Sequence, residues 1–181
     1  MKLLEKILGV AILIALFMKM YFIQDYGLLT VLSLSTLTLL YYPLGFFLFN
    51  NIKLIRVFKK DSYQGLSALR ILGSIGAGMA LAAITAGILF KLQHWQGGYS
   101  NLYSGLIFCL IILLIATIRY IRHKDKFYVR LFKRIAIVGG LGLILALTPD
   151  LTLAKIQFRN HPNYIKAYEA HIFRLTNFKE G

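Results

Sequence analysis

The chain has few acidic residues, few charged residues of either sign and a single cysteine. Of its 181 residues only seven are Asp or Glu, against 21 Lys or Arg, and charged residues make up 15% of the chain. Soluble globular proteins carry about 25% charged residues, so this composition excludes an ordinary soluble domain. A lone thiol, Cys109, cannot form an internal disulfide or build a zinc site. We expect it to pack as a small apolar side chain.

Long apolar segments take up most of the chain instead. A helix that crosses a bilayer needs about 20 apolar residues, because the hydrocarbon core is about 30 Å thick. The sequence therefore predicts an all-α fold: a polytopic integral membrane helix bundle with four to five transmembrane helices in hairpins. The predicted spans are residues 7–23, 28–49, 71–90, 102–118 and 135–147.

Two of these spans have features that set them apart. Residues 135–147 provide only 13 apolar residues before Thr148-Pro149, so this segment either crosses the membrane or re-enters it. Pro43 lies near the inner end of the second span. Because proline removes a helical hydrogen bond, we expect a kink there.

The basic residues are concentrated in three segments, and this indicates a topology. Fourteen of the 21 lie near the N-terminus or in the loops 50–70 and 119–134, while the short loops opposite hold Lys19 and Lys91. Excess Lys and Arg marks the cytoplasmic side, so we predict a multi-pass protein of the bacterial inner (cytoplasmic) membrane with a cytoplasmic N-terminus. The basic loops should also attract anionic lipid headgroups. Nucleic-acid binding is not expected, because no recognisable reading element accompanies the charge.

The third span carries a surface of small residues. Ser74, Gly78, Ala82 and Ala86 recur every four residues and share one helical face. Small side chains let membrane helices approach closely, so this face predicts a helix–helix contact, either within the chain or with another copy. We therefore expect a homo-oligomer or a membrane complex. The fifth span has a weaker version of the pattern, with two pairs of small residues spaced by four, Ala136/Gly140 and Gly142/Ala146.

The character of the chain changes after Pro149. We divide it into a transmembrane domain, residues 1–154, and an amphipathic C-terminal tail, residues 155–181. In the tail, an apolar stripe at helical spacing predicts an amphipathic helix on the membrane surface or against a partner; it comprises Ile165, Tyr168, Ile172 and Leu175.

The most distinctive short motif follows the third span. Lys91, His94 and Trp95 stand at i, i+3 and i+4, which would place them on one helical face at the outer mouth of the membrane. Trp favours the interface, Lys can extend towards it, and His titrates near neutral pH. We take this as a possible functional cluster.

The string around these residues resembles a known family. Gly-x-Leu-Phe-Lys-x-x-His-Trp-x-Gly, between two membrane helices over residues 71–118, is similar to the N-terminal transmembrane hairpin of the L subunit of the gliding-motility and type IX secretion motor. The resemblance implies that Lys91, His94 and Trp95 form a polar cluster at the outer mouth of the hairpin.

The chain also departs from that family's pattern. Gln96 stands where the family turn usually has Pro, and residues 110–115 have no counterpart of the membrane-embedded Glu that is taken to relay protons in the motor. The motor subunit's long cytoplasmic domain is missing too. The resemblance therefore implies a relative of the hairpin without the motor function.

These patterns favour one class of function over two others. No catalytic triad, paired carboxylate, phosphate-binding glycine loop or metal-ligand spacing appears, so we predict a non-enzymatic scaffold or accessory subunit without cofactor or metal. The alternative is a small transporter or channel, favoured by hydroxyl residues in the second span, such as Ser33 and Thr36, but lacking a charge near mid-membrane. An enzyme that uses Lys91 and His94 at the interface is the third possibility, although no partner group is visible.

Overall fold

The computed structural model describes residues 2–21, 26–52, 54–56 and 59–177, with side chains except those of residues 2, 20, 54, 60 and 171–177. The described part of the chain is helical and contains no strand. It forms two compact units, residues 1–146 and 147–181, whereas the division predicted from the sequence falls after residue 154.

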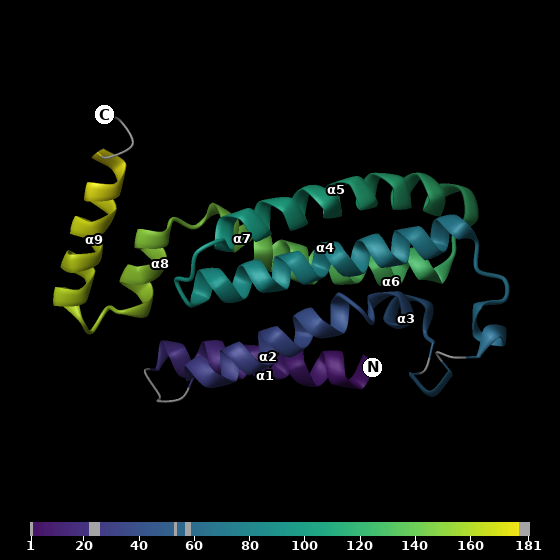
Figure 1. Ribbon diagram of the computed structural model, residues 1–181, viewed down its shortest axis with the longest axis horizontal. Coiled ribbons are helices and arrows are strands. Elements are labelled where there is room, and N and C mark those ends of the chain that lie inside the picture. The colour runs from purple at the N-terminus through teal and green to yellow at the C-terminus, as the bar shows by residue number, and fades with distance from the viewer. Residues whose placement is uncertain (1, 22–25, 53, 57–58, 178–181) are drawn as a thin grey trace. The chain divides into compact units, whose positions relative to one another are not determined.

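Unit 1 contains the helices that the apolar segments predict, with altered bounds (Figure 1). Its elements are α1 (Lys2–Met20), α2 (Tyr26–Tyr41), α3 (Gly45–Asn50), η1 (Leu54–Arg56), η2 (Lys60–Tyr63), α4 (Ala68–Leu92), α5 (Gly98–His123), α6 (Lys126–Arg134), the π-helix η3 (Ile135–Gly139) and α7 (Gly140–Leu147). In this unit α1 packs on α2, α2 and α3 pack on α4, and α4 packs on α5.

Two helices in the described residues, α4 and α5, are long and apolar enough to cross a membrane. A third candidate is the continuous helix Lys126–Leu147, if it forms one span together with α8 (Asp150–Gln157). α1 carries charges at both ends, at Glu5, Lys6 and Lys19, and α2 has only 16 residues. The structure thus supports two to three candidate spans, fewer than the four to five predicted.

The second and fifth predicted spans differ from expectation in opposite ways. The second is interrupted and not merely kinked: α2 ends at Tyr41, and α3 begins at Gly45 after the turn that contains Pro43. The fifth is longer than its 13 apolar residues, because the helix already starts at Lys126 in the basic loop. Asp125 caps this helix: its carboxylate accepts the Phe127 N–H at 2.8 Å.

Helices approach α4 at positions that lack a side chain. A Cβ on Gly78 would lie 2.6 Å from the Tyr41 carbonyl oxygen, and one on Gly45 would lie 2.7 Å from the Gly78 Cα. On the α5 side, a Cβ on Gly105 would lie 2.7 Å from the Ile84 side chain. α4 is therefore the central helix of unit 1, and glycines set its distance from its neighbours.

Ion pairs connect the segments predicted to be cytoplasmic. Both carboxylate oxygens of Glu5 accept hydrogen bonds from Arg134, at 2.6 and 2.7 Å, and the Tyr41 hydroxyl donates to Glu5 at 2.9 Å. Arg70 pairs with Asp125 at 2.8 Å. The Glu5 and Arg134 side chains are 17% and 12% exposed. The N-terminal segment and the two basic loops thus meet at one end of unit 1.

Unit 2 is a pair of helices. It consists of α8 and α9 (Pro162–Asn177), joined by a short turn, and Lys155 pairs with Glu169 at 2.7 Å across the two helices. The rings of Phe158 and Tyr164 lie 4.4 Å apart. Ile172 and Leu175 of the predicted apolar stripe lie outside the described side chains, so the amphipathic interaction of this helix stays a prediction.

The close approach at Gly78 gives a first prediction. Gly78→Ala should destabilise the protein by about 1–3 kcal/mol, because the added methyl group meets backbone atoms that cannot move away easily. Gly73, five residues earlier on α4, has open space at its Cβ. Gly73→Ala should therefore leave stability unchanged or raise it by up to about 1 kcal/mol through helix propensity. Thermal unfolding in detergent measures both; equal effects would contradict the packing described.

The Glu5–Arg134 ion pair gives a second prediction. Glu5→Gln should cost about 3–5 kcal/mol, because it leaves a mostly buried guanidinium without its counter-charge. Glu169→Gln is the matched control: it makes the same change in an ion pair whose side chains are 52% and 42% exposed, where about 1 kcal/mol or less is expected. Denaturant unfolding should separate the two variants clearly. A Glu5→Gln protein as stable as the control would show that the pair does not hold the helices together.

Candidate functional site

The predicted helical face of Lys91, His94 and Trp95 does not form. α4 ends at Leu92 with Gln93 as its cap, and His94 has a positive φ of 55°. The spacing i, i+3, i+4 places side chains on one face only inside a helix, and here the chain must reverse before α5 starts at Gly98. The backbone N–H of Trp95 donates to the Phe90 carbonyl at 2.8 Å, so the chain folds back onto the end of α4 at this residue.

The three side chains also differ in their environments. Lys91 is only 3% exposed, and its ammonium lies 3.6 Å from the centre of the Tyr99 ring. This is a cation–π contact between α4 and α5. Trp95 is half exposed, and its ring meets the Phe90 ring edge-on at 5.6 Å. Lys91 thus contributes to hairpin packing and is not presented at an open mouth.

A second lysine joins this end of unit 1. The Lys19 ammonium, at the end of α1, donates to the Leu92 carbonyl at 3.1 Å and lies 5.2 Å from the centre of the Tyr26 ring. This contact brings the end of α1 next to the end of α4. The C-terminal ends of these two helices, each followed by a turn predicted to be external, are therefore at the same end of unit 1.

The small-residue face of α4 has its partner in the same chain. Ser74, Gly78 and Ala82 are buried and Ala86 is partly buried. Gly78 contacts the α2–α3 junction, and the Ser74 hydroxyl accepts from the Asn50 side chain at 3.1 Å. This face is therefore occupied within unit 1, and the sequence could not decide between that and another copy.

A hydroxyl residue of α2, Thr38, is engaged in helix packing. The hydroxyl oxygens of Thr38 and Thr85 lie 2.9 Å apart across the α2–α4 contact. Each hydroxyl also lies within hydrogen-bond distance of a carbonyl of its own helix, Leu34 for Thr38 and Leu81 for Thr85. Because a hydroxyl has one hydrogen, one of the two donates across the contact and the other donates to its own helix. Such a pair links the two helices.

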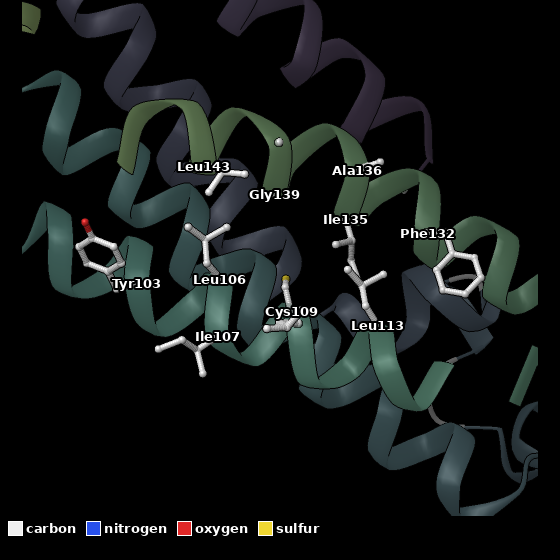
Figure 2. A pocket seen from close by; sticks show the side chains of 12 residues that line it. Tyr103, Leu106, Ile107, Cys109, Leu113, Phe132, Ile135, Ala136, Gly139 and Leu143 are labelled. Carbon is white, nitrogen blue, oxygen red and sulfur yellow. The ribbon is translucent and has the colours of Figure 1, made fainter. Parts of the chain in front are cut away.

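An apolar groove lies between α5 and the helix formed by α6, η3 and α7 (Figure 2). Its volume is about 720 Å³, within the range of ligand pockets. We call it the α5–α7 groove. It is lined by Tyr103, Leu106, Ile107, Cys109, Leu110, Leu113, Phe132, Ile135, Ala136, Gly139, Gly140 and Leu143.

The two walls of the α5–α7 groove differ in the size of their side chains. The α5 wall carries bulky residues such as Ile107 and Leu110. The other wall is low at Ala136, Gly139 and Gly140, between Phe132 and Ile135 on one side and Leu143 on the other. A Cβ on Gly140 would meet nothing within 4 Å. Bulky residues facing a strip of small ones are typical of surfaces where membrane helices pack.

Sequence reasoning found only part of this groove. The spacing of Ala136 and Gly140 marks its low wall, but α5 reads simply as an apolar span. The second small pair of this segment, Gly142 and Ala146, is buried instead, and a Cβ on Gly142 would lie 2.5 Å from the Ile84 side chain. Spacing alone cannot tell which small pair faces the core and which faces out.

No known protein family, characterised protein or solved structure matches this chain. Within the residues that the structure describes, no three His, Cys, Asp or Glu side chains gather into a group that could hold a metal ion.

Proposed function

We propose that this protein is a non-enzymatic, multi-pass inner-membrane protein that serves as a scaffold or accessory subunit of a membrane complex. Its α5–α7 groove would receive an apolar helix of another subunit. The observation that carries the proposal is the exposure of α5. Of its most apolar 18-residue stretch only 22% is buried, against 56% for α4.

Large apolar side chains make up most of the exposed surface of α5 between Tyr103 and Ile121. Ile107, Phe108 and Leu114 are each 58–60% exposed, and Ile118 and Ile121 continue the surface towards the basic end. Water would make such a surface costly, so it belongs in lipid or against protein. The adjoining groove favours protein over lipid as the partner of this surface. A surface that faces only lipid does not need a strip of small residues, whereas contacts between membrane helices use one.

Charge and contacts support the proposed topology, with the N-terminus in the cytoplasm. The Glu5–Arg134 and Arg70–Asp125 pairs gather the basic segments at one end of unit 1. The Lys19–Leu92 contact gathers the turns that are poor in Lys and Arg at the other. A chain that alternates between two such ends follows the positive-inside rule.

The proposal extends to a relationship between the α4–α5 hairpin and the hairpin of the gliding-motility motor subunit, without proton relay. In its support, Ala68–Leu92 and Gly98–His123 form an antiparallel pair around the Lys-x-x-His-Trp turn. α5 carries no carboxylate, and Lys91 is covered by Tyr99. We therefore assign the hairpin a role in assembly.

A groove-filling variant tests this proposal. Gly140→Leu puts a bulky side chain into the low wall, where nothing in the chain obstructs it, so folding should be retained while assembly is lost. Native mass spectrometry of protein extracted in native nanodiscs should show the complex of the original chain dissociated by at least about tenfold in the variant, as expected for a central contact worth more than about 1.4 kcal/mol.

Gly73→Leu on α4 is the matched control, since its Cβ also meets nothing within 4 Å but lies outside the groove. It should leave assembly intact. If the original chain is a monomer with no companion, or if both variants assemble equally, the proposed role is wrong.

A further inference from the structure

Three arginines and two carboxylates lie close together at the basic end of unit 1. Arg70, Arg130 and Arg134 bring three positive charges, and Glu5 and Asp125 bring two negative ones, so the cluster carries a net charge of +1. Arg70, Asp125 and Arg134 are the charged groups that act on Arg130. We call this set the arginine cluster.

Both carboxylates of the arginine cluster are already engaged. Glu5 accepts two hydrogen bonds from Arg134 and one from the Tyr41 hydroxyl. Asp125 accepts from Arg70 through one oxygen, and from the Phe127 N–H through the other. Every carboxylate oxygen in the cluster thus has a donor before Arg130 is considered.

Arg130 is the one arginine of the cluster whose guanidinium is not hydrogen-bonded to a carboxylate in the described residues. Its Nη2 donates a long hydrogen bond, 3.4 Å, to the Phe49 carbonyl at the end of α3. Its Nε is buried and has no hydrogen-bond partner within the described residues. A guanidinium has five N–H donors in a fixed fork, and a buried donor without an acceptor is costly. Within the described residues, no carboxylate accepts a hydrogen bond from Arg130, whose acceptor is a backbone carbonyl.

We infer that the arginine cluster is a binding site for a phosphate oxyanion, held mainly by the forked donors of Arg130. Arginine matches phosphate geometry through two parallel hydrogen bonds, and the excess charge of the cluster favours an anion. Arg130 as a whole is only partly buried, so part of its side chain is accessible to a ligand, although its Nε atom is covered. The phosphate is that of a lipid headgroup or a free phosphate, two sources with the same recognising chemistry.

This site is separate from the α5–α7 groove. Along α6, Arg130 and Arg134 are four residues apart and share one face, which is turned to Phe49 and Glu5. The groove is lined from the same segment by Phe132, Ala136 and Gly139. The inference therefore stands whether or not the groove receives a partner helix.

The test uses the full chain with two probes. In the first arm, nanodiscs contain phosphatidylcholine with or without phosphatidylglycerol, and lipid retained by the protein is counted by native mass spectrometry. In the second, inorganic phosphate is titrated calorimetrically into the protein in a non-ionic detergent. Arg130→Gln removes the charge and the fork. Lys133→Gln, on the same helix and exposed, makes the same change in net charge.

A specific site predicts that Arg130→Gln weakens binding by at least about tenfold, while Lys133→Gln stays within about twofold of the original chain. Loss confined to the phosphatidylglycerol arm identifies a lipid headgroup, and loss in the phosphate arm alone identifies free phosphate. Equal losses in the two variants, or no binding by the original chain in either arm, would overturn the inference.

A folding defect in Arg130→Gln would show as an altered circular dichroism spectrum or a lowered melting temperature. Arg130→Lys then takes its place, because it keeps the charge but not the forked donors. Binding weakened several-fold supports the site, and binding equal to that of the original chain overturns the role given to the guanidinium.

Discussion

The packing of unit 1 depends on how closely its helices can approach α4. In a bilayer, lipid tails are as apolar as leucine, so helices gain little by burying apolar surface against each other. Close backbone packing and hydrogen bonds therefore contribute more to holding the helices together. Gly45 and Gly78 meet at the α3–α4 contact, and Gly105 lets α5 approach Ile84. A side chain at any of these positions would push a helix away from the centre.

This constraint also determines which surface stays available. Because the small-residue face of α4 is covered by α2 and α3, it cannot serve assembly. α5 packs on α4 through one face, whose buried residues include Leu102, Gly105 and Cys109, while large apolar residues on its other side are exposed. The α5–α7 groove continues this outward surface. The polar contacts at the two ends of the unit, Glu5 with Arg134 and Lys19 with Leu92, keep the hairpins in register around the central helix.

The sequence predicts the helical class and the positions of most helices, because apolar length and charge placement are local properties. It fails where tertiary contacts or backbone geometry decide. Lys91, His94 and Trp95 have the spacing of a helical face, but the left-handed turn at His94 ends the helix first. The small residues around Gly78 predict a helix–helix contact, but they do not show which helix provides the partner surface. The ion pair of Glu5 with Arg134 joins residues 129 positions apart, and no local sequence pattern predicts it.

The central claim is that α5, and not α4, is the surface through which this protein meets other subunits. Photo-crosslinking in native membranes tests it most directly, with a photoreactive residue placed either at Leu110 in the α5–α7 groove or at Met79, which is 50% exposed on α4. The account predicts protein adducts from Leu110 and lipid adducts alone from Met79. Protein adducts from Met79 alone, or equally from both positions, would contradict it.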